Sequence, residues 1–391
     1  MANYEAAPLE PAEDLADRTT RDRAGAVPAP GAPTADKSVR ASESEALATF
    51  YVVTGAVDCY WRCSSPAKVI GANLVEIPSD AASELLGHHP ERVYESHEGV
   101  GVWIRPDPVR ARHALAMEEY GIPTVAEVDD NYLSKPRLNL FMRENRITSD
   151  NQRAHLRTMA IFQRCVFSTA WLRDRYHKAF KELGHVPELA VCRNHANLDD
   201  WHQPEPSNRL RVGWAGSGQH VRDIKLVAEA LAWARGAGHE VVHMGHDPRD
   251  STDVTDPKAL DACMAWGAII TRQIPWVDPE TYHTRPLPLD IGLAPLERND
   301  HTLGKSDVKW IEYTMSGAAT IASSGTVYND IVHGETGILA GSPTEFTYWT
   351  KYLCEHPATR QELVRGAEEY IRSNRTMQAQ GKQEWEEAIG A

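Results

Sequence analysis

The chain has 391 residues, 42% of them hydrophobic, which is enough to form the packed cores of two or three domains. Its formal net charge of −14 argues against general polyanion binding, and no apolar run approaches the ~18 residues of a membrane span. The cysteines are scattered, and only Cys59 and Cys63 are close in sequence, so we expect reduced thiols rather than a zinc site.

The first 45 residues are rich in alanine, proline and charged residues and have almost no large apolar side chains. Such a segment cannot bury enough surface to offset the entropy lost on ordering, which predicts a disordered tail over residues 1–45. Its acidic, proline-rich composition is not that of a signal peptide, and we therefore expect a cytoplasmic protein.

Residues 46–200 alternate between apolar runs and helical segments. One helix is expected over about residues 109–120, ending at Gly121. Strands are expected at residues 48–55, 99–106, 123–130, 164–170 and 187–194. Alternation of this kind predicts a doubly wound parallel sheet.

A polar, proline-rich stretch near residues 200–208 predicts a linker, and a second alternating unit then extends to about residue 375. This unit opens with the strand and loop RVGWAGSG, which end at Ser217, and a helix carrying Arg222 follows. Glycines allow the backbone to approach a phosphate, and the start of a helix offers free amides and a positive dipole. Residues 376–391 predict a final helix.

The most informative segment is GKSDVKWIEYTMSGAATIASSGTVYNDIVHGETGILA, residues 304–340. It begins with a Gly-Lys-Ser turn, continues into an amphipathic helix carrying Glu312, and passes through an apolar run to a glycine-rich turn. This layout is able to hold a nucleoside diphosphate at the carboxyl edge of a parallel sheet.

The order of these residues resembles the donor-binding segment of retaining glycosyltransferases of family 4, which have the GT-B fold. Glu312 corresponds to the second Glu of that family's Glu–seven residues–Glu motif, and HGETGIL corresponds to its final turn, whereas Gly304 stands in place of the first Glu. The resemblance implies an α/β protein with two Rossmann-like doubly wound parallel-sheet domains facing a central cleft. Residues 46–200 would form the acceptor-side domain and 208–375 the nucleotide-sugar domain. The helix over 376–391 would pack back on the first domain through Trp385.

The resemblance, together with the place of Lys305 between Gly304 and Ser306 at a helix start, suggests a set of site residues. Lys305 and Glu312 are expected to be catalytic, with Lys305 at the diphosphate and Glu312 at the ribose. The residues expected to bind the donor are Gly55, Gly216, Ser217, Arg222, Ile274, Gly304 and Ser306. Ser217 replaces the Arg that the family has in this loop, and an ordinary solvated residue at a helix start remains the alternative for Arg222.

The strand at residues 123–130 ends in two carboxylates, Asp129 and Asp130. The resemblance places Asp129 against the transferred sugar as a third catalytic residue, whereas for Asp130 we favour a capping role. No third ligand for a metal is evident, so neither a metal nor another cofactor is expected, and the nucleotide-sugar is a co-substrate. The resemblance implies transfer with retention, and Tyr60, Trp61 and Arg62 are expected to face the donor or the acceptor.

The acceptor is suggested by an uneven charge distribution. Residues 134–193 contain 12 Lys and Arg against 5 Asp and Glu, a net charge of +7 in a chain of net charge −14. Within this stretch Arg143, Arg146 and Arg153 are expected to bind an anionic macromolecule. The leading candidate is a 5-hydroxymethylated pyrimidine in DNA, flipped out of the duplex, as for related bacteriophage enzymes.

Other interpretations of these features stay open. The basic stretch is at least as well explained by a solvated helical face and a loop, and the acceptor would then be a protein or a cell-envelope glycan or lipid. A different class of protein also fits, a nucleotide-sugar-binding protein that has lost catalysis. The missing first Glu favours this class, whereas Lys305, Glu312 and the glycine loops oppose it.

Overall fold

The computed structural model describes residues 46–53, 60–77, 97, 99–134, 149–200, 202–216, 221–245, 247–250, 257–275 and 286–390. The tail predicted over residues 1–45 lies outside these residues.

A first sheet of six parallel strands has the order β2-β1-β3-β4-β5-β6. Its strands are β1 (Ala48–Val53), β2 (Asn73–Ile77), β3 (Val100–Ile104), β4 (Thr124–Val128), β5 (Arg164–Phe167) and β6 (Glu188–Val191). Five of them fall within the predicted segments. The sixth, β2, lies where no strand is expected from the sequence, because this edge strand is short and only partly buried.

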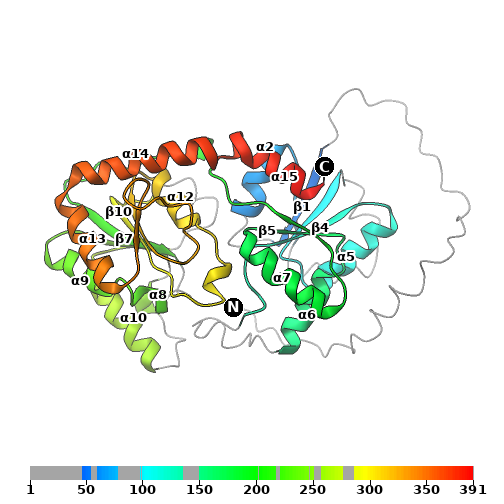
Figure 1. The fold of residues 1–391 in the computed structure, drawn as a ribbon, viewed down its shortest axis with the longest axis horizontal. Coiled ribbons are helices and arrows are strands. Elements are labelled where there is room, and N and C mark those ends of the chain that lie inside the picture. Colours follow the sequence, from blue (N-terminus) through cyan, green and yellow to red (C-terminus); the bar gives the residue numbers. More distant parts are fainter. Residues whose placement is uncertain are drawn as a thin grey trace, which may run out of the picture. The chain divides into compact units, whose positions relative to one another are not determined.

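Helices cover both faces of the first sheet, because the strands present apolar side chains alternately to each face (Figure 1). Tyr51 and Trp103 belong to the core formed with α5 (Pro108–Glu119), α6 (Ser149–Met159) and α7 (Ala170–Leu183). Phe50 and Val102 belong to the core formed with α2 (Ser65–Ile70) and α15 (Lys382–Ile389).

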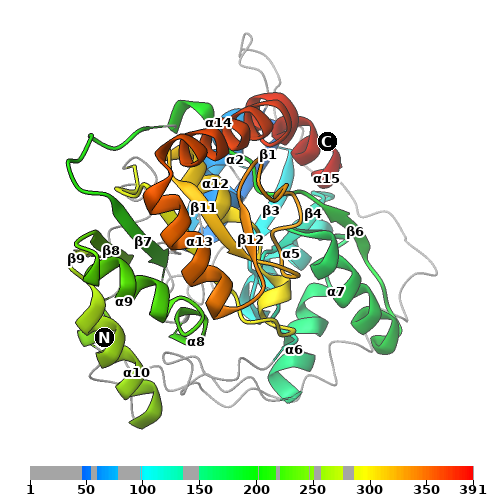
Figure 2. The same cartoon turned by 60° about the vertical axis from the view of Figure 1, so that its left-hand side comes forward.

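A second sheet, also of six parallel strands, has the order β12-β11-β10-β7-β8-β9. Its strands are β7 (Arg211–Gly216), β8 (Glu240–Gly245), β9 (Arg272–Pro275), β10 (Ile291–Ala294), β11 (Ala319–Ser323) and β12 (Ile338–Ala340). Its helices are α8 (Val221–Ile224), α9 (Ala228–Gly236), α10 (Pro257–Ile269), α12 (Val308–Met315), α13 (Pro343–Glu355) and α14 (Pro357–Asn374). One core joins the sheet to α12 and α14, and a second joins it to α8, α9, α10 and α13, as Figure 2 shows for α9 and α13.

The chain passes between the two sheets twice, after β6 and again after α14. The two crossing segments are hydrogen-bonded to each other: the Ala196 N–H donates to the Arg375 carbonyl at 2.8 Å, and the Met377 N–H donates to the Ala196 carbonyl at 2.8 Å. After the second crossing, α15 packs on the first sheet, where the Trp385 ring lies edge-on to Phe50 with 5.4 Å between ring centroids. In the part of the chain that is described, no helix has both the length and the apolar character needed to cross a membrane.

Candidate functional site

The strand order of each sheet marks a preferred ligand position. The winding reverses between β7 and β10 in the second sheet and between β1 and β3 in the first. In open parallel sheets, ligands bind at the carboxyl ends of the strands on either side of such a reversal. Gly216 ends β7, and the segment after β10 leads to the turn at residues 304–307, whereas Arg105 directly follows β3. These segments therefore define the candidate site.

The turn at residues 304–307, which we call the GKSD turn, begins at the last residue of a 3-10 segment (Thr302–Gly304) and leads into α12. Its first residue touches the segment that follows β4, since a Cβ on Gly304 would lie 2.7 Å from the Cβ of Asn131. That distance is shorter than side chains tolerate, so the close approach explains why glycine occupies this position.

The other three residues of the turn are held by polar contacts. The Lys305 ammonium lies 2.7 and 2.9 Å from the two carboxylate oxygens of Asp130. The Asn194 amide donates to the Ser306 hydroxyl at 2.8 Å. Asp307 accepts two hydrogen bonds from the Arg375 guanidinium, at 2.8 and 2.9 Å. The turn is thus tied both to the carboxyl end of β4 and to the two crossing segments.

Two acid–base pairs lie side by side at the carboxyl ends of β3 and β4. Asp129 accepts from Nε of Arg105 at 2.6 Å and from a second nitrogen of the same guanidinium, and Asp130 pairs with Lys305. Burial raises the pKa of Asp130, but the charges of Lys305 and Arg105 outweigh it, so that this pKa lies below its usual value. The capping role expected for Asp130 is wrong, because its side chain binds the Lys305 ammonium instead.

Arg105 is a site residue that the sequence interpretation missed. Its φ of 48° is in the left-handed region, which non-glycine residues rarely adopt and which is enriched at functional sites. Its backbone N–H donates to the Glu127 carbonyl at 3.0 Å, and its side chain reaches Asp129. The available signal was its place near the end of the strand predicted over residues 99–106, at the edge where the other candidate residues gather.

Glu312 lies on α12 and is 8% exposed. Lys309, one turn earlier on the same helix, places its ammonium 3.0 Å from Oε2, and Nε1 of Trp61 donates to Oε1 at 3.4 Å. The predicted residues Glu312 and Trp61 are therefore brought together from opposite ends of the chain. Lys309 adds a cation that the sequence interpretation overlooked, because a lysine three residues before a glutamate is common on helix surfaces.

Tyr60 and Trp61, the two aromatic residues expected to bind the acceptor, are both buried. The Tyr60 hydroxyl donates to Asp200 at 2.6 Å, and burial together with this carboxylate raises the pKa of Tyr60. The Tyr60 and Trp61 rings lie edge to face, with 5.2 Å between their centroids.

The expectation that Arg62 faces the donor or acceptor requires correction. This side chain is 1% exposed, and its guanidinium donates to Glu127 at 2.6 Å, to the Cys192 carbonyl at 2.8 Å and to Asn194 at 3.0 Å. It also stacks over the Trp385 ring, 4.8 Å from the centroid. Burial raises the pKa of Glu127 to about 7 despite the Arg62 charge. Arg62 thus lies inside the first domain, where Glu127 balances its charge. A buried charge is tolerated only when it is paired in this way.

The remaining expected residues are distributed over the second sheet and α6. Arg222 on α8 pairs with Glu297 at 3.1 Å, and Ile274 lies on β9, partly buried against the core that contains α12. A Cβ on Gly216 would meet the Trp214 ring at 2.4 Å, so glycine is required by close packing. Arg153 is exposed on α6. Gly55, Ser217, Arg143 and Arg146 lie outside the described residues.

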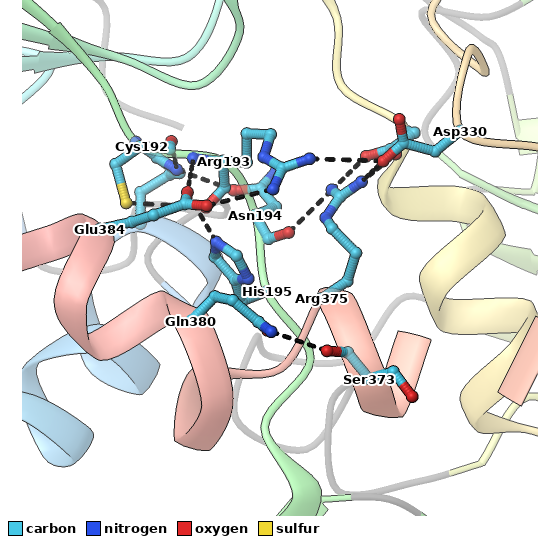
Figure 3. A network of polar contacts seen from close by, with 11 residues as sticks. Cys192, Arg193, Asn194, His195, Asp330, Ser373, Arg375, Gln380 and Glu384 are labelled. Atoms are coloured by element: carbon cyan, nitrogen blue, oxygen red, sulfur yellow. Dashed lines mark hydrogen bonds and ion pairs between the residues drawn. The ribbon is translucent and has the colours of Figure 1, made fainter. Parts of the chain in front are cut away.

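A partly buried polar network connects the crossing segments beside the GKSD turn (Figure 3). Arg375 and Arg193 both point toward Asp330, at 2.5 and 3.5 Å, and Arg375 also donates to the Asn194 carbonyl at 2.9 Å. Glu384 of α15 lies between Arg193 and His195, at 3.1 and 2.8 Å. Although burial raises the pKa of Glu384, His195 and Arg193 lower it to about 2.

Within the described residues, no group of three or more His, Cys, Asp or Glu side chains is arranged to hold a metal ion. The chemical groups that the structure assembles are instead cations, carboxylates and a glycine turn at strand ends.

No model of a known protein family matches the chain, and no curated protein matches it in sequence. Solved structures do match. HepE of Anabaena in complex with UDP-glucose superposes with a TM-score of 0.61 at 12% identity, over 88% of this chain and 100% of that chain. A glycosyltransferase of Rickettsia africae gives a TM-score of 0.58 at 11% identity, over 88% and 98% of the two chains.

Sucrose-phosphate synthase of Thermosynechococcus elongatus matches with a TM-score of 0.56 at 10% identity, over 86% of this chain and 97% of that chain. At such identities the likeness shows the fold alone. The fold is GT-B, with two Rossmann-like α/β domains, which confirms the fold class expected from the sequence.

Proposed function

We propose that this protein is a glycosyltransferase that moves a sugar from a nucleoside-diphosphate sugar to an acceptor hydroxyl. The observation that carries the proposal is the position of Lys305 and Glu312. Both follow β10, beside the reversal of winding where a parallel sheet binds ligands, and both face residues of the first domain, Asp130 and Trp61. The UDP and UDP-glucose complexes of HepE, which shares the fold, support a nucleotide-sugar as donor.

Each residue has a distinct role in this proposal. Glu312 accepts hydrogen bonds from the ribose hydroxyls, because its buried carboxylate offers acceptor oxygens only. Lys305 binds the diphosphate and stabilises the negative charge that grows on it as the glycosidic bond breaks. Asp129 is held by Arg105 at the end of β4, where it would accept a hydrogen bond from the transferred sugar.

We further propose that transfer proceeds with retention and without a bound metal. The acceptor hydroxyl would attack from the face of the leaving group, and a donor phosphate oxygen would take its proton. A pair of carboxylates in hydrolase geometry is not evident in the sequence, which favours transfer over hydrolysis.

The test is release of nucleoside diphosphate from a panel of UDP-, GDP- and dTDP-sugars, with the anomeric configuration of the product determined by NMR. We expect Glu312→Ala to weaken donor binding by about 1.5–3 kcal/mol, because a hydrogen bond to a charged group is lost. Lys305→Ala should lower turnover more than donor affinity. The exposed Glu362→Ala and Lys178→Ala serve as matched controls. Unchanged kinetics in folded Glu312 and Lys305 variants would reject the proposal.

For the acceptor we propose a macromolecule, with 5-hydroxymethylated pyrimidine in DNA as the leading candidate. The support is the excess of basic residues over 134–193, including Arg153, which is exposed on α6. Charge reversal at Arg143, Arg146 and Arg153 should reduce transfer to such DNA and spare donor binding. Each lost phosphate contact should flatten the log–log salt slope by roughly 0.7–0.9.

If neither wild type nor the triple variant labels this DNA, a protein or a cell-envelope glycan or lipid becomes the acceptor to examine. Donor binding without transfer to any acceptor would identify a nucleotide-sugar-binding protein that has lost catalysis. The replacement of the first motif Glu by Gly304, which packs against Asn131, is the observation that favours this second function.

A further inference from the structure

Lys305, the residue expected at the donor diphosphate, is already bound to an anion of the protein. Its ammonium contacts both carboxylate oxygens of Asp130, at 2.7 and 2.9 Å. Asp130 follows β4 of the first sheet, whereas Lys305 belongs to the GKSD turn after β10 of the second. The two Asp130 carboxylate oxygens therefore bind the Lys305 ammonium as two oxygens of a diphosphate would.

The pair is accessible enough for exchange. The Lys305 side chain is 21% exposed and that of Asp130 is 23% exposed, so neither partner is sealed in the core. An ion pair with solvent access is screened and only weakly favoured, whereas a diphosphate brings at least two negative charges to the same ammonium. A bound diphosphate would thus take Lys305 from Asp130.

The charges around the pair show why Asp130 opposes a second anion. Asp129 lies next to it in sequence and is already bound by Arg105, so the two carboxylates and the two cations balance. His301 adds a further positive influence, and its charge, like those of Lys305 and Arg105, lowers the pKa of Asp130. A ligand that brings a diphosphate adds negative charge to a balanced cluster, and it must compete for the cations.

We propose that Asp130 is a positioning residue that holds Lys305 in the absence of donor and competes with the donor diphosphate for it. This inference rests on the proposed function and deepens it, because it makes Asp130 a determinant of donor affinity and selectivity. Ligands with a diphosphate displace the carboxylate, whereas a nucleoside without phosphate does not.

A double-mutant cycle with UDP as the probe tests the proposal, with dissociation constants measured by calorimetry at fixed ionic strength. Asp130→Asn should bind UDP about two- to fivefold more tightly than wild type, because the competing ion pair is lost. A residue with a merely structural role would lower affinity when replaced, so a gain in affinity distinguishes the two. In the Lys305→Met background the same change should produce no gain.

Glu188→Gln is the matched control. It removes one negative charge from the same domain, but its partner is Arg164 at the amino ends of β5 and β6, the opposite edge of the sheet. This variant should bind UDP as wild type does, which separates local competition from the effect of net charge. Asp130→Ser provides a second replacement should the asparagine variant not fold, and uridine should bind equally to wild type and to Asp130→Asn.

The outcomes separate this inference from the proposed function. Unchanged or weaker UDP binding by the Asp130 variants, or an equal gain in the Lys305→Met background, overturns the inference and leaves the proposed function standing. Failure of wild type to bind UDP, GDP and dTDP overturns both.

Discussion

Replacement of Arg375 by methionine tests how much of the protein's stability depends on the network between the crossing segments and the GKSD turn. Methionine retains most of the apolar volume of the side chain and removes the guanidinium. That group is 2% exposed and donates to both oxygens of Asp307, to Asp330 and to the Asn194 carbonyl. Asp307 is 9% exposed and would be left as a buried carboxylate without its guanidinium.

The expected loss in the free energy of unfolding is about 3–5 kcal/mol, the value typical of removing one partner of a buried ion pair. Summing the individual hydrogen bonds would exceed this range, but bonds that share one group are not additive. Asp330 contributes less, because it is 28% exposed and also pairs with Arg193.

Urea unfolding followed by circular dichroism provides the measurement. Arg365→Met, an exposed change on the same helix α14, should stay within about 0.5 kcal/mol of wild type. The double variant Arg375→Met with Asp307→Asn should recover part of the loss, because no uncompensated carboxylate remains. A loss below about 1 kcal/mol, or strict additivity of the two changes, would refute the reasoning.

Three further predictions concern other contacts of the site. Arg62→Met should cost about 3–5 kcal/mol in unfolding free energy, because it leaves Glu127 buried without its partner. Adding Glu127→Leu should restore part of this stability. If the double variant is as unstable as Arg62→Met alone, the paired-charge explanation is wrong. Gly304→Ala should cost about 1–3 kcal/mol, since the new Cβ would lie 2.7 Å from that of Asn131, and Asn131→Gly should relieve it; a neutral result would contradict the close approach. The pKa of Glu384 is lowered to about 2, from about 4.5 in the unfolded chain. The resulting stability is fully present above pH 4.5 and is lost as the pH falls toward 2. Glu384→Gln should therefore flatten the dependence of unfolding free energy on pH between about 5 and 2. An unchanged acid limb in that variant would show that Glu384 is not responsible.

The fold was largely predictable because the central strands of both sheets are buried on both faces and therefore appear as continuous apolar runs. Strands β3 and β4 are buried at every residue, and both were expected at nearly their observed bounds. Strand β2 gave no such signal, since an edge strand with Leu74 41% exposed needs no continuous apolar sequence. Packing against neighbouring elements, rather than local sequence propensity, determines whether such a segment forms a strand.

The sequence indicated which residues gather where they stand at strand ends, and not where a contact depends on distant partners. Asp130 and Lys305, which the structure brings together, stand at the end of an apolar run and in a glycine turn. Arg62 was misinterpreted because nothing near it in sequence indicates that Glu127, 65 residues away, would bury and neutralise it. The Arg375–Asp307 contact joins residues 68 apart, and only the tertiary structure brings them together.

The contacts of the GKSD turn differ in solvent exposure, and this difference affects how a donor would bind. Asp307 and Arg375 are almost fully buried, Gly304 is packed against Asn131, and Ser306 is bound by Asn194. Only the Lys305–Asp130 pair has both side chains more than a fifth exposed. A competing anion can reach this pair while the other three contacts persist, because a long lysine side chain changes rotamer without moving its backbone. The turn would then remain in place as its ammonium passes from carboxylate to diphosphate, so that ordering of this turn's backbone would not oppose donor binding.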